Sequence, residues 1–125
     1  MNTTTSFTIG FIGLGVMGRP MANNLVNNGY NVVAYDVVPE FVAEAVKFGA
    51  TAAASIQEAV CDSDMVITML PNGSHVKSVA LGEGGMAEYA KKGTLLIDMS
   101  SISTTDSIEI NESLKEKGLR MIDAP

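Results

Sequence analysis

Residues 7–18 read Phe7-Thr-Ile-Gly-Phe-Ile-Gly-Leu-Gly-Val-Met-Gly18, and residues 32–36 read Val32-Val-Ala-Tyr-Asp36. An apolar run leads into a Gly-x-Gly-x-x-Gly turn, and an acidic residue closes the next apolar run 18 positions after the last glycine. A strand, a glycine turn, a helix and a second strand that ends in a carboxylate are typical of the βαβ unit that binds dinucleotides. The stretch therefore predicts a nucleotide site at the start of an α/β fold.

The three glycines of the turn have separate physical tasks. Gly13 allows the tight turn out of the strand, Gly15 lets a pyrophosphate approach the backbone, and Gly18 lets the following helix pack on the strand. The predicted helix runs from about Val16 to Asn28. Its first N–H groups and its dipole attract phosphate without a basic side chain. An ordinary strand-to-helix turn is the alternative interpretation of these glycines.

Asp36 is the acidic partner of the glycine turn. A carboxylate at this point accepts both hydroxyl protons of an adenosine ribose and repels a 2′-phosphate, which favours NAD over NADP. Asp36 alone could equally be a solvated residue at the end of a strand. Domains that bind FAD share this geometry, and the residues leave that alternative open.

Composition limits the classes of protein to consider. The 125 residues predict one domain with a real core, since 46% are hydrophobic and 18% are charged. The net charge of −6 argues against nucleic acid or an anionic membrane as partner. No signal peptide and no membrane span are predicted, because no basic leader and no run of 18 apolar residues occur.

The single cysteine, Cys61, cannot form an internal disulfide, which suits a reducing cytoplasm. No arrangement of cysteine and histidine predicts a metal site. Residues 1–6 are polar and threonine-rich, and we expect a loose lead there, with the folded domain at 7–125.

A repeated helix-to-strand transition predicts the architecture. Gly29, Gly49, Gly93 and Gly118 each follow a helical segment and precede an apolar strand. Glycine at these positions adopts the left-handed conformation that ends a helix. The alternation predicts a doubly wound, Rossmann-type α/β fold with a mainly parallel sheet of about six strands and helices on both faces.

Other predicted elements have their own signals. Pro39 begins a helix that reaches about Phe48, Ser55 and Glu58 form a capping box, and Ser103 caps a helix that runs to Lys117. Strands are predicted at residues 50–54 and 65–70, and short helices at 74–81 and 86–91.

Ligands of open parallel sheets bind at the carboxyl ends of the strands, so the residues that follow each strand are site candidates. Leu70 and Pro71 offer an apolar wall for a cofactor, although a plain turn would also explain them. Ser100 and Ser101 offer hydroxyl and N–H groups near a nicotinamide, or simply cap a helix. His75, the only histidine, is expected on a helix surface near the cofactor, not as a general base.

Carbonyl reduction needs a proton donor beside the hydride acceptor. The lysines fall at helix ends and on exposed faces, and the sequence stops directly after an apolar strand. We therefore expect this chain to be the amino-terminal part of a longer enzyme, with no catalytic residue of its own.

Three segments, 11–25, 67–72 and 96–101, resemble the β-hydroxyacid dehydrogenases of the 3-hydroxyisobutyrate dehydrogenase type. The resemblance covers essentially the whole chain after residue 6. Residues 75–77 and 79–83 are most similar to the members that reduce tartronate semialdehyde, also called 2-hydroxy-3-oxopropionate.

The resemblance implies that NADH gives hydride to the aldehyde carbon of a short 3-oxo acid and so forms a β-hydroxy acid such as glycerate. It implies cofactor contacts at Gly13, Leu14, Gly15, Val16, Met17, Gly18, Asp36, Leu70, Pro71, His75 and Ser101. It also implies substrate contacts at Ser101 and Asp123.

In that family the catalytic lysine lies in an all-helical second domain, which also forms much of an oligomer interface. The resemblance thus implies a homo-oligomeric full-length enzyme and an inactive isolated domain. A 3-hydroxyisobutyrate dehydrogenase, a non-catalytic nucleotide-binding module and a flavin enzyme are the alternatives.

Overall fold

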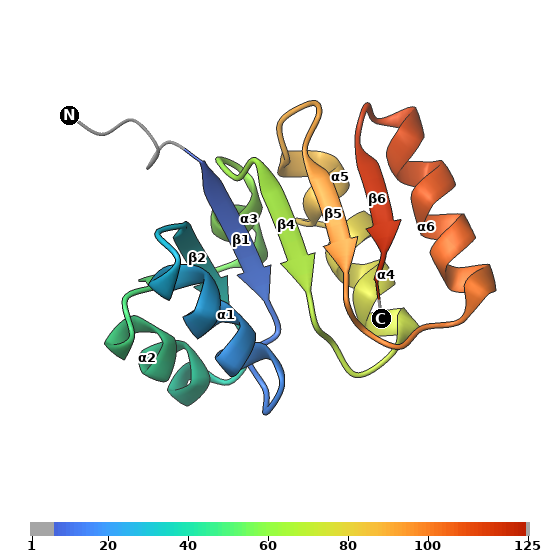
Figure 1. Cartoon of the computed structure of the whole chain (residues 1–125). Helices are drawn as coiled ribbons and strands as arrows, with labels where there is room; N and C mark the ends of the chain where they lie inside the picture. Colours follow the sequence, from blue (N-terminus) through green and yellow to red (C-terminus); the bar gives the residue numbers. More distant parts are fainter. Residues whose placement is uncertain (1–6, 125) are drawn as a thin grey trace.

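The computed structural model describes residues 7–124, in which strands and helices alternate except for two consecutive helices between the fourth and fifth strands (Figure 1). The predicted loose lead, residues 1–6, and Pro125 lie outside the described residues. The elements are β1 (Thr8–Ile12), α1 (Gly18–Asn27), β2 (Asn31–Tyr35), α2 (Pro39–Lys47), β3 (Thr51–Ala52), α3 (Ile56–Val60), β4 (Met65–Thr68), α4 (Gly73–Leu81), α5 (Met86–Tyr89), β5 (Leu95–Asp98), α6 (Thr104–Glu116) and β6 (Arg120–Asp123).

The six strands form one sheet in the order β3-β2-β1-β4-β5-β6, and every neighbouring pair is parallel. The chain begins at the centre with β1, winds outward to β3, and then returns through α3 to β4 on the other side of β1. The direction of winding therefore reverses between β1 and β4, where ligands of doubly wound sheets bind. The predicted Rossmann-type fold is confirmed.

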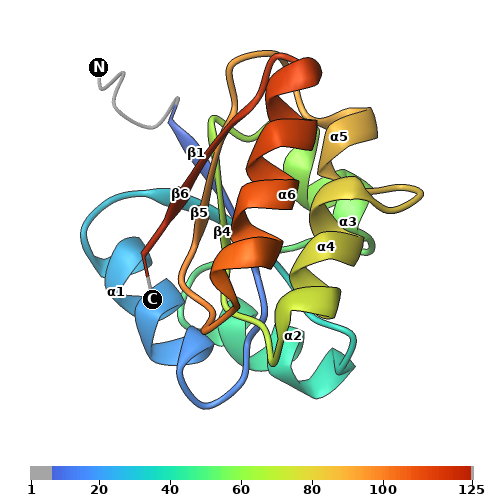
Figure 2. The same ribbon diagram turned by 90° about the vertical axis from the view of Figure 1, so that its right-hand side faces the viewer.

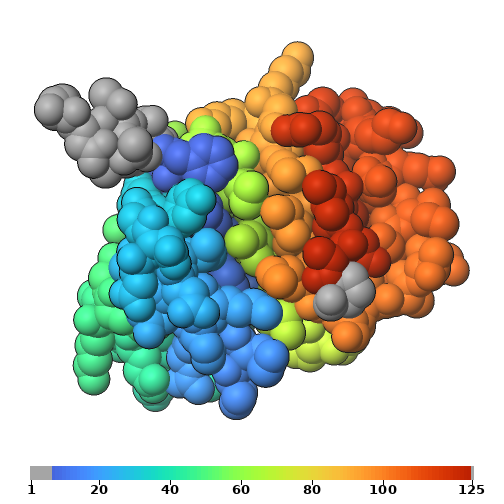
Figure 3. Space-filling model, in the orientation of Figure 1, coloured from blue at the N-terminus to red at the C-terminus, as the bar shows by residue number. Residues whose placement is uncertain are grey.

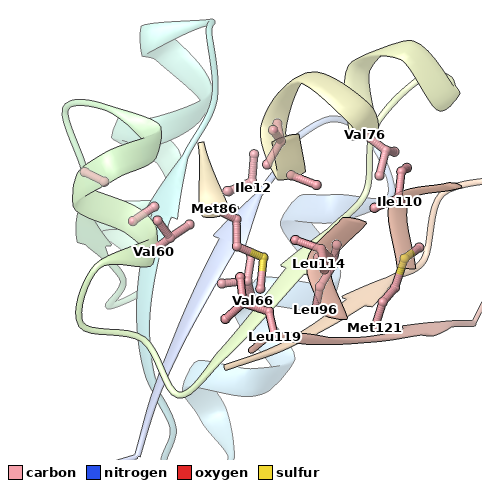
Figure 4. Close-up of a cluster of buried hydrophobic side chains, with 14 residues drawn as sticks. Ile12, Val60, Val66, Val76, Met86, Leu96, Ile110, Leu114, Leu119 and Met121 are labelled. Atoms are coloured by element: carbon pink, nitrogen blue, oxygen red, sulfur yellow. The ribbon is translucent and has the colours of Figure 1, made fainter. Parts of the chain in front are cut away.

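Helices pack on both faces of the sheet and enclose two apolar clusters. On one face, α1 and α2 cover a cluster that includes Phe11 and Val32. On the other face, α3, α4, α5 and α6 cover a larger cluster around Val66 and Leu96 (Figure 4). Seen edge-on, α1 lies on one side of the strands and α4, α5 and α6 on the other (Figure 2). On the α1 side, β4, β5 and β6 reach the surface (Figure 3), and Ile122 of β6 is an exposed large hydrophobic residue.

The serine caps and helix-ending glycines that the sequence predicted are present in the structure. Ser55 Oγ accepts from the Glu58 N–H at 3.2 Å, and Ser103 Oγ accepts from the Asp106 N–H at 3.0 Å, so both predicted caps are confirmed. The four predicted helix-ending glycines all have positive φ, between 79° and 114°. The Glu58 carboxylate accepts from the N–H of Ala54, one residue before the cap.

Several helices and strands are shorter than the sequence predicted. The helix expected from Val16 begins only at Gly18, because residues 15–17 form a turn before it. The strand expected at residues 50–54 is limited to Thr51–Ala52, which is an edge strand paired with β2 alone. The strand expected at 65–70 ends at Thr68, and the helix expected at 86–91 ends at Tyr89.

Gly10 has a packing role that the sequence analysis did not anticipate. A Cβ built at Gly10 would overlap the Ala59 carbonyl oxygen and lie 2.9 Å from Ser63 Oγ. The backbone at the end of α3 therefore lies directly on β1. This close contact sets the position of α3 on the sheet, where α3 connects β3 to β4.

None of the helices within residues 7–124 has both the length and the apolar character needed to cross a membrane.

We predict that Gly10→Ala lowers the free energy of unfolding by about 1–3 kcal/mol, because the added methyl group overpacks the contact with α3. In an unobstructed strand the same change would stabilise the protein by roughly 0.5–1 kcal/mol, so the sign is diagnostic. Urea denaturation measures the effect, with Gly15→Ala as the control, since no described atom lies within 4 Å of a Cβ there. A Gly10→Ala variant as stable as the parent would contradict the packing role.

Candidate functional site

A cavity of about 580 Å³ opens at the carboxyl edge of the sheet, where β1, β2 and β4 end. Its volume lies within the range of small-molecule sites. Its lining comes from the glycine turn, from three helices, and from the segments that directly follow β2 and β4, which we call the exits of these strands. The lining residues are Ile12, Gly13, Gly15, Val16, Met17, Gly18, Tyr35, Asp36, Val37, Val38, Phe41, Ile56, Met69, Leu70, Pro71, His75, Ser78 and Val79. The cavity therefore lies where the winding of the sheet reverses.

The glycine turn brings unpaired backbone N–H groups to this cavity. Among the described residues, no acceptor is found for the N–H groups of residues 15–18. Met17, at the cap position of α1, makes no side-chain cap, and the first turn of the helix holds no acidic residue. Free amides and the positive end of a helix dipole favour a bound anion, and phosphate is the usual one.

The protein itself needs glycine at two of the three turn positions. Gly13 has φ +106°, and a Cβ there would overlap the Met69 carbonyl oxygen. A Cβ at Gly18 would overlap the Gly13 carbonyl oxygen, so α1 packs closely on the turn. Gly15 differs, because no described atom lies within 4 Å of a Cβ and its φ is not positive. Neither packing nor backbone conformation requires glycine at position 15, whereas a ligand at the backbone would.

Asp36 fastens the glycine turn to the end of β2. The Leu14 N–H donates to Asp36 Oδ2 at 2.7 Å, and the Val38 N–H donates to Asp36 Oδ1 at 2.9 Å. A carboxylate has about four acceptor positions, so each oxygen can accept a further hydrogen bond from a ligand hydroxyl. The sequence analysis assigned Asp36 to a ligand and missed this structural role. The contact with Val38 had a local signal, because an aspartate often accepts from the N–H two residues on.

The opposite wall is held by the start of α4. Asn72 caps this helix, with Oδ1 accepting from the N–H groups of Ser74 at 3.1 Å and His75 at 3.2 Å. The same oxygen lies 2.8 Å from His75 Nδ1. Because an amide oxygen only accepts, this contact places a proton on Nδ1 and leaves Nε2 of the neutral ring as an acceptor. Leu70 and Pro71 complete the wall.

The structure brings together nine of the eleven predicted cofactor residues as lining of this cavity. Leu14 is not among them, since its side chain is fully buried against the α1 face of the sheet and only its N–H turns to Asp36. Ser101, which follows β5, and the predicted substrate residue Asp123, the last residue of β6, are exposed and lie outside the lining.

Several lining residues had no recognisable signal in the sequence. Phe41, Ile56 and Val79 come from three different helices, and only the packing of those helices brings them to one cavity. Met69 and Tyr35 could have been inferred from their places beside the predicted strand ends.

The titratable groups in the lining are Tyr35, Asp36 and His75, and none of the lining residues within 7–124 is a lysine. The pKa values that shift belong to residues outside the lining. The Thr8 N–H and the Lys91 ammonium lower the pKa of Asp64, and Glu109 raises the pKa of Lys77. Within the described part of the chain, no group of three or more His, Cys, Asp or Glu residues is placed to hold a metal ion.

Comparison with known proteins agrees with this geometry. The family model for the NAD binding domain of 6-phosphogluconate dehydrogenase matches residues 8–125. The chain is 42% identical over 120 residues to the 2-(hydroxymethyl)glutarate dehydrogenase of Eubacterium barkeri, covering 96% of this chain and 40% of that protein. It is 43% identical over 117 residues to the 3-sulfolactaldehyde reductase of Escherichia coli K12, covering 94% of this chain and 39% of that protein.

A solved structure extends the likeness to three dimensions. The 3-hydroxyisobutyrate dehydrogenase of Mycobacterium tuberculosis with L-serine superimposes with a TM-score of 0.90 at 39% identity, covering 95% of this chain and 40% of that one. The chain thus spans about 40% of the length of the relatives it matches.

We predict that Gly15→Val reduces the affinity for ADP at least about tenfold, because the side chain fills the space beside the free amides. The free energy of unfolding should change by no more than about 0.5 kcal/mol, as for other open positions. Calorimetric titration with ADP and urea denaturation measure the two effects. Ala54→Val, an enlargement at an exposed position outside the lining, is the control. Unaltered ADP affinity in Gly15→Val would exclude a diphosphate at this turn.

Proposed function

The chain belongs to the family described as the NAD binding domain of 6-phosphogluconate dehydrogenase, and from this premise we propose that it holds NAD(H) for the reduction of a short 3-oxo acid. The substrate we propose is tartronate semialdehyde or a close analogue, and the product is a β-hydroxy acid such as glycerate. The predicted resemblance to hydroxyacid dehydrogenases is confirmed by the relatives, and one of them is named as an aldehyde reductase.

The observation that carries the proposal is the open space at Gly15 beside the N–H groups of residues 15–18, for which residues 7–124 provide no acceptor. A diphosphate there would receive hydrogen bonds from the start of α1 and the favourable field of its dipole. Basic side chains do not compete for this role. Arg19, the nearest one in sequence, pairs with Glu44 at 2.9 Å and stacks on the Phe41 ring.

Asp36 supports NAD over NADP as the cofactor. Each oxygen of the Asp36 carboxylate accepts one backbone hydrogen bond, from the N–H of Leu14 or of Val38. Each oxygen therefore has a further acceptor position for one of the two ribose hydroxyls. A 2′-phosphate at that point would face a like charge, and the lining residues within 7–124 include no lysine or arginine to offset it.

The cavity suits the adenosine diphosphate half of the cofactor. Asp36, the glycine turn and the apolar side chains of α3 and α4 line one cavity. In our proposal the nicotinamide half continues past Leu70 and Pro71 along the ends of β4 and β5. That path leads toward Ser101 and Asp123, where the semialdehyde would bind, and it accounts for the positions of these residues outside the cavity.

Hydride transfer to a carbonyl also needs a proton donor. We propose that a lysine in the part of the relatives' length that this chain does not span supplies it. By this proposal the isolated chain binds cofactor without catalysis, and the longer protein is a cytoplasmic homo-oligomer.

A 3-hydroxyisobutyrate dehydrogenase is the second candidate activity, and the high structural similarity to one such enzyme favours it. Both candidates need the same cofactor site and differ only in the semialdehyde.

We predict that Asp36→Ala weakens NADH binding and narrows the discrimination against NADPH about tenfold or more, because the repulsion of the 2′-phosphate is lost. The ratio of the two affinities is the informative quantity. Loosening of the turn through Leu14 weakens both cofactors alike, whereas loss of the charge affects their ratio. Fluorescence titration measures it, and Glu40→Ala, which removes the same charge from an exposed site in α2, is the control. Parallel changes for both cofactors would exclude the ribose role.

The reaction is tested by following NADH oxidation in the longest protein that contains this chain. Tartronate semialdehyde, methylmalonate semialdehyde and 3-sulfolactaldehyde are compared as substrates. We expect the highest kcat/KM with tartronate semialdehyde. Preference for methylmalonate semialdehyde would favour the second candidate. NADH binding without oxidation by any of the three would favour a non-catalytic module, and bound flavin would overturn the cofactor assignment.

A further inference from the structure

A buried polar network joins the exits of β4 and β5. Thr68 Oγ1 donates to Asp98 Oδ1 at 2.8 Å, and the Ser100 N–H donates to the same oxygen at 3.1 Å. The Leu70 N–H then donates to Ser100 Oγ at 2.7 Å. Thr68, Asp98 and Ser100 are each 0% exposed.

This network continues the sheet beyond the end of its backbone ladder. The last backbone bond between the two exits runs from the Met99 N–H to the Thr68 oxygen at 2.9 Å. One step further along, the Leu70 N–H has a side chain as its acceptor, Ser100 Oγ. The position of Leu70 relative to residue 100 is therefore set by Asp98 and its neighbours, not by strand pairing.

Asp98 holds this position at an energetic disadvantage. Burial of a carboxylate is unfavourable unless its oxygens are hydrogen-bonded. Within the described residues, Asp98 Oδ2 is buried and finds no hydrogen-bond partner, so only Oδ1 is used. Asp98 does not line the cavity, and direct contact with a ligand does not explain it.

We propose that Asp98 is a positioning residue that acts through Thr68 and Ser100 to hold the β4 and β5 exits in register for the nicotinamide half of the cofactor. The inference rests on the proposed function. Leu70 lies at one end of the network and Ser101 follows its other end, so both sides of the nicotinamide path depend on one buried acceptor. The glycine turn and Asp36 have separate anchors, so the adenosine half depends on the network only through Leu70, which also lines the cavity.

The geometry also fixes what each substitution removes. Asp98→Ala deletes the shared acceptor, and Ser100→Ala deletes only the link to Leu70. Asp98→Asn keeps an oxygen at the position of Oδ1 and should behave like the parent. Ser63→Ala is a matched control, because Ser63 is also a buried serine whose Oγ bonds a backbone group, the Ala59 oxygen at 2.6 Å, but it precedes β4 at the opposite edge.

The test is the ratio of NADH affinity to ADP affinity, measured by calorimetric titration on the whole protein. ADP carries only the adenosine and diphosphate groups. We expect the ratio to fall about tenfold in Asp98→Ala and Ser100→Ala, since the nicotinamide half would pass between both displaced segments, whereas ADP contacts only Leu70 among them. The ratio should stay near that of the parent in Asp98→Asn and Ser63→Ala. A purely structural role would leave the ratio unchanged and lower only stability.

If the ratio of NADH affinity to ADP affinity is the same in Ser100→Ala as in Ser63→Ala, the positioning role is overturned. If Asp98→Ala does not fold, the result for Ser100→Ala decides alone. Asp98→Asn with the ratio of Asp98→Ala also overturns it, because the acceptor oxygen would then not be the determinant. A parent protein that binds neither NADH nor ADP overturns the proposed function itself, and the inference falls with it.

Discussion

Parallel pairing of β1 with β2 on one side and β4 on the other is the constraint on which the site depends. Parallel strands end at the same edge, so the three connections that follow them leave the sheet together. The helix after β1 and the helix after β4 then pack on opposite faces, which opens a space between them. The cavity occupies that space, and its lining is drawn from the same three exits.

The edge is also where backbone groups leave the ladder and need other partners. Side chains supply them at most points: Asp36 accepts from Leu14 and Val38, Asn72 caps α4, and Ser100 accepts from Leu70. The start of α1 differs from these points, because the N–H groups of residues 15–18 have no acceptor among the described residues. Ser55, Asn72 and Ser103 cap α3, α4 and α6 with their side chains, whereas the start of α1 has no side-chain cap and opens toward the cavity.

The same arrangement explains why this chain forms only half of a reaction centre in our proposal. The adenosine and diphosphate groups would lie in a cavity lined by a carboxylate and by the N–H groups of the glycine turn. The ends of β5 and β6, by contrast, present Ser101 and Asp123 to the surface. The chain spans about 40% of the length of its relatives, and in our proposal the remaining length completes the reaction centre.

The sequence by itself determined the features that depend on neighbours along the chain. The glycine turn, the caps at Ser55 and Ser103 and the helix-ending glycines follow from backbone sterics and local hydrogen bonds, and their order implied the parallel fold. Only the tertiary structure decided which residues from separate elements meet. Gly10 is needed because α3 crosses β1 there, Phe41 and Val79 share a cavity, and Asp98 bonds Thr68 across 30 residues. Such contacts depend on how helices and strands pack in three dimensions, and no local pattern encodes that packing.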